Sequence, residues 1–112
     1  MPEGFATTPE PPYYAVIFTS QRTEGDNGYE AMASAMFELA VKQPGCLGAE
    51  HARGHNGLGI TVAYFSDEAA IFAWKQNAQH LGAQRLGKAR WYSHYEIRVA
   101  KVERSYSGPE GR

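Results

Sequence analysis

The sequence is short of the residues that usually mark a cofactor site or a compartment. A single cysteine, Cys46, excludes an intramolecular disulfide framework and any metal site built from several cysteines. No apolar run approaches the roughly 20 residues of a membrane-spanning helix. The stretch 1–12 contains four prolines and no apolar core, so it does not resemble a secretory signal. We therefore expect a cytoplasmic protein that does not insert into a membrane, and the sequence contains no flavin or nicotinamide fingerprint.

The net charge is also small, −1 at neutral pH over 112 residues. This value gives no general attraction to nucleic acid, so we expect no nucleic-acid partner. The charges are nevertheless uneven, because residues 1–50 carry seven acids and two bases while residues 51–112 carry nine bases and five acids. A basic end of one domain can bind a small anion, but this pattern more often marks a solvated surface.

Apolar and aromatic residues, by contrast, are plentiful. Hydrophobic residues make up 43% of the chain, which includes five Phe, two Trp and seven Tyr. A chain of this length buries about 65% of the surface exposed in its unfolded state, enough for one core. We predict one domain over residues 13–106, with disordered tails at 1–12 and 107–112.

Hydrophobic periodicity orders the domain as strand, helix, strand, strand, helix, strand. Strands are expected at 13–22, 46–53, 58–65 and 91–106, and helices at 28–43 and 67–81. The two tight turns carry clear signals, because Pro44-Gly45 ends the first helix and Asn56-Gly57 favours a hairpin.

Finer local features can also be predicted. Asn27 and Glu30 have the spacing of a capping box, and Ser66 is expected to cap the second helix. The last strand is unusually long, and its apolar phase changes after Val99, which predicts a bulge there. Its excess length would let it reach onto a second copy of the chain.

Two successive β-α-β units of similar length predict an α+β fold of the ferredoxin-like type, βαββαβ, with four antiparallel strands and both helices on one face. The strands at 13–22 and 58–65 are apolar on both of their faces. Something other than the helices must therefore cover the second face of the sheet. The simplest cover is the same face of a second copy, so we predict a homodimer.

Three stretches resemble the antibiotic biosynthesis monooxygenase (ABM) family: Tyr14 to Phe18 (YAVIF), Gln43 to Glu50 (QPGCLGAE), and Ala73-Trp74. The resemblance extends over about Tyr13 to Arg104. It implies a dimeric α+β barrel. It also implies a cofactor-independent monooxygenase acting on a small planar aromatic or phenolic substrate, in which the substrate supplies the electrons that reduce dioxygen.

Other members of the family degrade haem, and for them the resemblance is weaker. Their iron-ligating His stands ten residues after the helix Trp, where this chain has Gln84. They also carry an Asn on the first strand, where this chain offers Thr19 and Ser20. A haem-binding or haem-degrading oxygenase is therefore a minor alternative, and a non-catalytic dimeric module that binds a small ligand is the main one.

The resemblance suggests roles for residues of the second helix. Trp74 would line the cavity between helices and sheet, although plain core packing explains an apolar-stripe Trp equally well. His80 would accept a proton from a substrate hydroxyl, which suits an imidazole, or it is simply a surface residue. Asn77 lies on the same flank as His80 and would contact the substrate.

Residues of the last strand complete the expected site. His94, Glu96 and Arg98 alternate on one face, where they can orient an acidic phenol and stabilise an oxyanion, or merely form the solvated face of an edge strand. Arg98 and Arg90 are both candidates for the family's cavity arginine. The predicted catalytic residues are thus His80, Trp74 and Arg98, and the predicted substrate-binding residues are Asn77, Tyr64, Arg90 and His94.

Overall fold

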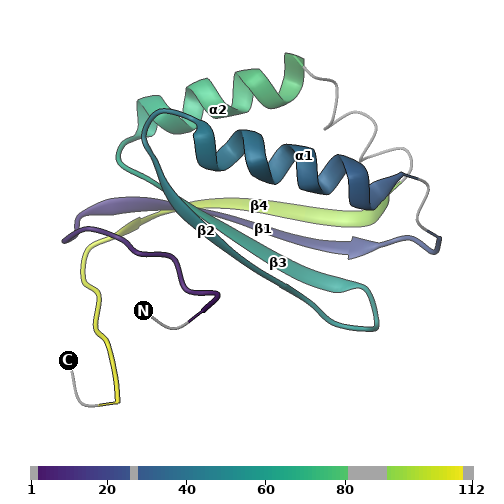
Figure 1. Cartoon of the computed structure of the whole chain (residues 1–112), viewed down its shortest axis with the longest axis horizontal. Coiled ribbons are helices and arrows are strands. Elements are labelled where there is room, and N and C mark those ends of the chain that lie inside the picture. Colours follow the sequence, from purple (N-terminus) through teal and green to yellow (C-terminus); the bar gives the residue numbers. More distant parts are fainter. Residues whose placement is uncertain (1–2, 26–27, 81–90, 110–112) are drawn as a thin grey trace.

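The computed structural model describes residues 3–25, 28–80 and 91–109, except for the side chains of residues 78–80, and contains all six predicted elements. The elements are β1 (Tyr13–Arg22), α1 (Tyr29–Lys42), β2 (Cys46–Arg53), β3 (Leu58–Phe65), α2 (Glu68–His80) and β4 (Tyr92–Val102) (Figure 1). Within these described ranges, no helix has the length and apolarity needed to cross a membrane.

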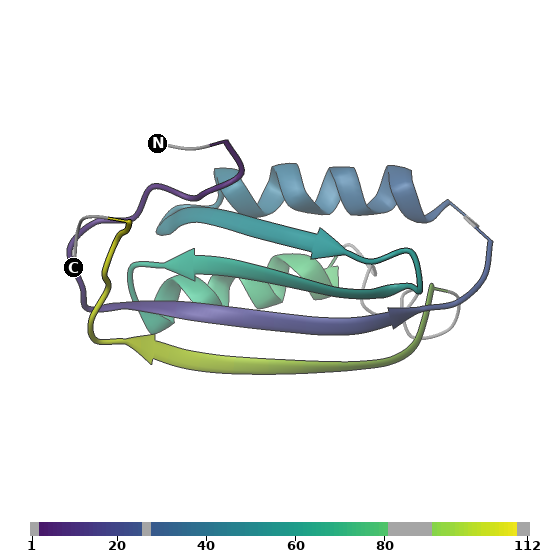
Figure 2. The same cartoon turned by 90° about the horizontal axis from the view of Figure 1, so that it is seen from below.

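The four strands form one antiparallel sheet in the order β2-β3-β1-β4, and both helices lie on the same face of it (Figure 1). Figure 2 views the sheet from the side without helices: α1 lies outside the edge strand β2, and α2 lies behind β3 and β1. Strand β4 forms the other edge of the sheet. The predicted ferredoxin-like α+β fold is confirmed.

The starts of the two helices bear on the predicted caps. Gly28 precedes α1 in a left-handed conformation (φ 83°). Asn27, on which the predicted capping box depends, lies outside the described residues. At α2 the carboxylate of Asp67 accepts the backbone N–H of Ala70 at 2.8 Å. Asp67 therefore caps this helix in place of Ser66. Its negative charge at the helix N-terminus also interacts favourably with the helix dipole.

The turn between α1 and β2 fixes where α2 begins. The carbonyl of Gly45 accepts the backbone N–H of Ser66 at 2.8 Å, and Gly45 has a φ of 88°. A Cβ at this position would lie 2.5 Å from the Cβ of Ala70. The absence of a side chain at Gly45 thus allows the turn to touch α2, and from there α2 runs back over the sheet toward the β2–β3 hairpin (Figure 1).

The pairing register determines which side chains face the helices. Opposed residues on neighbouring strands share a face, so the helix-covered face is built from rows that cross all four strands. Taken across β2, β3, β1 and β4, the row nearest the hairpin is Arg53, Gly59, Ser20, Tyr95; the next rows are His51, Thr61, Phe18, Ile97 and Ala49, Ala63, Val16, Val99.

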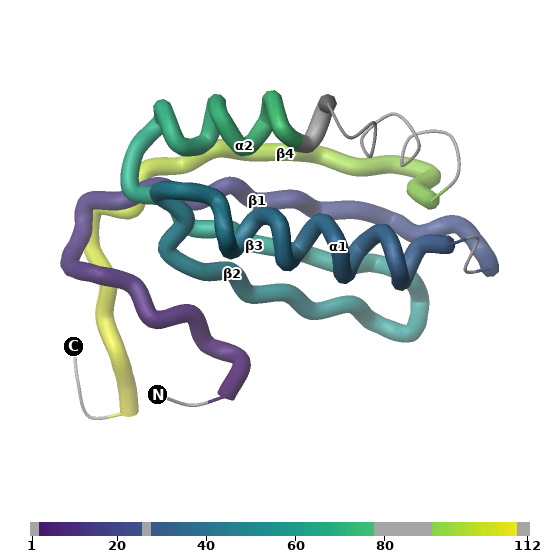
Figure 3. The backbone as a smooth tube through the Cα atoms, turned by 45° about the horizontal axis from the view of Figure 1, so that its top comes forward, coloured from purple at the N-terminus to yellow at the C-terminus, as the bar shows by residue number. Residues whose placement is uncertain are grey.

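The other face of the sheet, which we call the open face, carries no helix. Residues 3–12 form no helix or strand and pass along this face near β2, whereas the chain after β4 extends away from the end of the sheet (Figures 1 and 3). The backbone N–H of Ala6 donates to Oε2 of Glu50 at 3.0 Å, and the hydroxyls of Thr8 and Tyr13 are 3.1 Å apart. The remainder of the open face exposes apolar residues, including Leu58 (48%) and Ile60 (46%).

Strand β4 differs from its prediction in length and in the position of its bulge. It ends at Val102 rather than Tyr106, so the expected overhang is not formed by this strand. Its register is unbroken from His94 to Val102, and the irregularity lies before it, where Gln21 pairs with His94 and Arg22 with Tyr92. The apolar phase changes after Val99 because Val99 faces the helices while Val102, opposite Tyr13, faces the open side.

Candidate functional site

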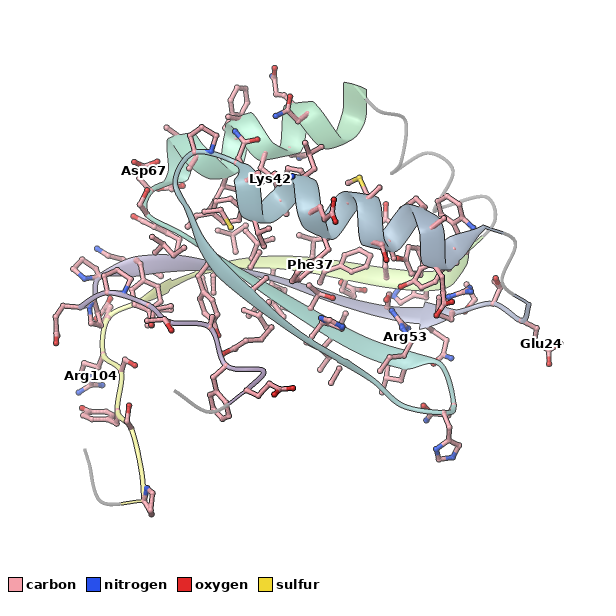
Figure 4. All side chains as sticks on the ribbon, viewed as in Figure 1. Glu24, Phe37, Lys42, Arg53, Asp67 and Arg104 are labelled. Carbon is pink, nitrogen blue, oxygen red and sulfur yellow. The ribbon has the colours of Figure 1, made fainter. Side chains whose placement is uncertain are left out.

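The row nearest the hairpin is the polar end of the helix-covered face. Arg53 extends from β2 across Gly59 of β3 and reaches β1, where its Nη2 donates to Oγ of the buried Ser20 at 2.7 Å. This path exists because Gly59 has no side chain: a Cβ there would lie 2.5 Å from Cζ of Arg53. Figure 4 shows Arg53 directed from the strand toward the first turn of α1.

Tyr29, the first residue of α1, lies close to two guanidinium groups. Cζ of Arg22 lies 3.8 Å from the centroid of the Tyr29 ring, and Cζ of Arg53 lies 5.7 Å from it. Nη2 of Arg53 also donates to the Tyr29 hydroxyl at 3.3 Å. Such placement over a ring face is favourable for a cation.

Both arginines are held mainly by carbonyl oxygens. Arg22 donates to the carbonyls of Trp91 at 2.8 Å and Gly25 at 3.0 Å, and Arg53 to those of Ser20 and Gly57. Among the described residues, no carboxylate forms an ion pair with either guanidinium. The two guanidinium groups therefore bring two positive charges to this end of the face.

Aromatic rings from β1, α1 and the start of β4 complete the cluster. The Tyr92 hydroxyl donates to that of Tyr29 at 3.5 Å, and their rings meet edge to face at 5.8 Å. The ring of Phe18 lies 5.3 Å from Tyr92 and 5.5 Å from Tyr95. We call the set formed by Phe18, Tyr29, Trp91, Tyr92 and Tyr95 the aromatic cluster; Trp91 is its most buried member, at 3% exposure.

Burial raises the pKa of Tyr92 well above its usual range, and the hydrogen bond to Tyr29 acts in the same direction. The positive charges of Arg53 and Arg22 oppose this rise. The Tyr92 phenol is therefore protonated at neutral pH and acts as a hydrogen-bond donor.

An apolar strip continues from the aromatic cluster along the edge of the sheet. Ile97 and Val99 belong to the helix-covered face, yet they remain 46% and 54% exposed, so α2 does not seal this part of the sheet. A solvent-open hollow of about 230 Å³ lies at the start of the same strand, lined by Tyr92, Ser93, His94 and Tyr95. Aromatic cluster and apolar strip together form a surface suited to a flat, largely apolar ligand with one polar end.

Of the predicted residues of α2, the structure describes the side chains of Trp74 and Asn77. Trp74 is half-buried and, with Ala70 and Ile71, forms the less exposed side of the helix. Asn77 donates to Oε1 of Gln43 at 2.7 Å and so joins α2 to the end of α1. His80 ends α2, and its side chain is not among those described; Arg90 and Gln84 lie outside the described residues.

The other predicted site residues lie on the open face and do not meet Trp74 within one protomer. His94 and Arg98 flank Glu96, with Nε2 of His94 2.8 Å from its Oε2 and Nη2 of Arg98 4.0 Å from its Oε1. His94 and Arg98 are exposed, as expected for charged residues of an edge strand.

Tyr64 is also on the open face. Its hydroxyl donates to Oε1 of Glu50 at 2.6 Å, and its ring meets Tyr13 edge to face at 5.8 Å. Burial, and then the bond to Glu50, raises the pKa of the Tyr64 phenol.

The sequence analysis missed Arg53, Ser20 and Arg22. The Asn56-Gly57 signal does not supply this register, because a two-residue turn at these positions would set Arg53 opposite Ile60. In the structure the turn has three residues, closed by the bond from the Gly54 N–H to the Leu58 carbonyl, and it sets Arg53 opposite Gly59. His51 was also passed over; its ring packs on Phe37 at 5.6 Å between centroids, and Figure 4 shows Phe37 pointing from α1 to the sheet. In the part of the chain that the structure describes, no group of three or more His, Cys, Asp or Glu residues could hold a metal ion.

Comparison with known proteins gives this geometry its context. No family model matches the chain. The uncharacterized protein YqjZ of Bacillus subtilis (strain 168) is 47% identical over 104 residues, which cover 93% of this chain and 91% of YqjZ. The chain belongs to the YqjZ family.

Solved structures extend the comparison of this YqjZ-family chain to the fold. SnoaB from Streptomyces nogalater, a cofactor-independent oxygenase, superposes with a TM-score of 0.71 at 12% identity, covering 83% of this chain and 95% of its own. A protein from Nitrosomonas europaea, assigned to the antibiotic biosynthesis monooxygenases, gives 0.65 at 11% identity, with coverage of 87% and 93%. The predicted ABM resemblance is thereby confirmed for the fold.

Proposed function

We propose that this protein is an ABM-type, cofactor-independent monooxygenase that oxidises a small planar aromatic substrate bearing a phenol or enol. One observation carries the proposal: a half-open apolar strip on the helix-covered face leads to a cluster of aromatic rings beside two guanidinium groups without carboxylate partners. Flat apolar rings fit the strip, and a developing negative charge fits its polar end.

The chemistry would proceed through the electron-rich anion of the substrate. Loss of one proton gives an enolate that donates electrons to dioxygen. An anthrone illustrates the balance, because its methylene group and one O₂ yield a carbonyl group and one water. Trp74 would cover the substrate from α2, and His80, at the end of α2, would accept the proton.

Oxygen uptake tests the proposal. Metal-free protein is mixed with anthrone, and uptake is compared with that of buffer alone. We expect catalysed uptake that falls at least tenfold in His80→Ala and about threefold in Trp74→Phe, since proton transfer is typically worth 10²–10⁴ in rate. His55→Ala, on the distant hairpin, provides the matched control and should retain full activity. Absence of uptake across anthrones and quinols would overturn the proposal.

A non-catalytic, ligand-binding module is the second candidate. It is favoured by the hydrogen bonds that both guanidinium groups donate to backbone carbonyls, because such bonds also fit arginines that only stabilise the fold. The two candidates differ in one result: the module would bind planar phenols without consuming oxygen.

We also propose that the open face pairs with the same face of a second copy. Leu58 and Ile60 expose almost half of their surfaces there, beyond the stretch lined by residues 3–12. An isologous contact would bury these apolar side chains on both protomers at once.

A further inference from the structure

We propose that the Tyr29 hydroxyl donates the hydrogen bond that holds an anionic oxygen of the ligand, and that Arg53 acts as its positioning residue. The inference rests on the proposed function in that the aromatic cluster is taken to receive a planar aromatic ligand. It adds a named contact, provided by α1 and β2, that the resemblance to known oxygenases does not supply.

The bonding around the Tyr29 oxygen carries the argument. This oxygen accepts one hydrogen bond from Nη2 of Arg53 at 3.3 Å and one from the Tyr92 hydroxyl at 3.5 Å. A phenol has two acceptor lone pairs and one proton, so both acceptor positions are used and the proton is left to donate. No described residue accepts that proton, and Tyr29 is only half-buried.

The charges around Tyr29 make this donor suited to an anion. Among the described residues, the guanidiniums of Arg22 and Arg53 and the phenol of Tyr92 contact its ring or hydroxyl. A hydroxyl that accepts from a guanidinium is polarised, and its own donated bond becomes stronger. The two positive charges close to the ring then favour an ionised ligand oxygen over a neutral one.

The aromatic walls restrict the ligand further. Tyr92 and Tyr95 line the hollow together with Ser93 and His94, and Phe18 lies against both tyrosine rings. The Tyr92 hydroxyl lies 3.5 Å from the Tyr29 hydroxyl, so a ligand that stacks on Tyr92 from the hollow can bring an oxygen to Tyr29. The chemical class is therefore an aromatic phenol or enol that binds as its anion.

Alizarin provides the probe, because its ionised form absorbs at longer wavelength than its neutral form. Its absorbance is titrated with and without saturating protein, from pH 4 to pH 9. We expect bound alizarin to ionise at a pH at least one unit lower than the free dye. In Tyr29→Phe most of that difference should be lost, with about tenfold weaker binding of the ionised dye and unchanged binding of the neutral dye.

A second variant tests the same contact if Tyr29→Phe does not fold. Gly59→Ala keeps every charged group but displaces the Arg53 guanidinium, since the new Cβ would overlap Cζ. It should reduce the same difference in ionisation, whereas Tyr106→Phe, on the exposed chain after β4, should leave it intact. Failure of alizarin to bind, or equal ionisation in wild type and Tyr29→Phe, would overturn the inference. If alizarin ionises as expected but anthrone causes no oxygen uptake, the proposed function fails and this inference stands.

Discussion

Tyr64 and Glu50 are joined by a 2.6 Å hydrogen bond on the open face of the sheet, between β3 and β2. The second oxygen of the same carboxylate accepts the backbone N–H of Ala6. One side chain of β2 therefore holds both a neighbouring strand and the segment that precedes β1. Bonds to a charged acceptor are stronger than neutral ones, so this carboxylate is a main attachment point of residues 3–12.

Replacing the carboxylate by an amide should loosen that segment. In Glu50→Gln the acceptor charge is lost while the side-chain shape is kept, and we expect about 1–2 kcal/mol less stability. Amide hydrogen exchange at Ala6 should become faster in the folded protein. Glu38→Gln, on the exposed side of α1, should change neither quantity. Unaltered exchange at Ala6 in Glu50→Gln would contradict the prediction.

Two tyrosines should make the protein sensitive to alkali. The pKa values of Tyr64 and Tyr92 are raised in the folded state, first by burial and then by hydrogen bonds to Glu50 and Tyr29. Below about pH 10 both folded and unfolded chains keep these protons, and there is no pH dependence from this source. Above about pH 10 the unfolded chain loses them first, so the free energy of unfolding should fall as pH rises.

Urea unfolding between pH 8 and pH 11 measures this effect. The double variant Tyr64→Phe, Tyr92→Phe should show a smaller loss of stability across this range than the wild type. Equal losses in the two proteins would show that these phenols do not control alkaline stability.

The contact between Gly45 and Ala70 predicts a strongly destabilising substitution. Gly45→Ala would combine a residue at φ 88° with a Cβ only 2.5 Å from another Cβ, and should cost about 3 kcal/mol or more. Gly28→Ala is the matched control, because its φ of 83° is similar but its Cβ would meet open space. It should cost about 1 kcal/mol. Thermal unfolding that ranks the two variants equally would mean that the clash is relieved.

The proposed dimer predicts that self-association depends on Ile60 and not on Phe72, although Phe72 is more exposed. Ile60→Glu places a charge in the centre of the open face and should weaken self-association at least about tenfold. Phe72→Glu, on the outer side of α2 and 64% exposed, should leave association unchanged. Sedimentation velocity at micromolar concentration distinguishes these outcomes, and a monomeric wild type would overturn the dimer.

Local sequence signals predicted the main elements because they repeat over many residues. Strands 13–22, 46–53 and 58–65 have the predicted bounds. The last strand was predicted too long because the sequence after Val102 still contains β-favouring residues. Its end depends on pairing instead: β1 begins at Tyr13, so no partner residue is left beyond Val102.

The site was less accessible to such reasoning, because its residues come from four strands and one helix turn. Periodicity correctly placed His94, Glu96 and Arg98 on one face, but it does not say which face the helices cover. The meeting of Arg53 with Ser20 requires both the β2–β3 and the β1–β3 registers. Neither register is visible in the periodicity of a single strand.

The adjacency of β1 and β4 also has a consequence for synthesis on the ribosome. β1 emerges first among the strands, yet one of its two neighbours is the last strand to be made. Until residues 92–102 leave the exit tunnel, the nascent chain exposes an unpaired, apolar strand edge in the middle of the future sheet. Protection of this edge from aggregation during translation therefore depends on how soon β4 arrives, and chains that stop before it keep the edge of β1 unpaired.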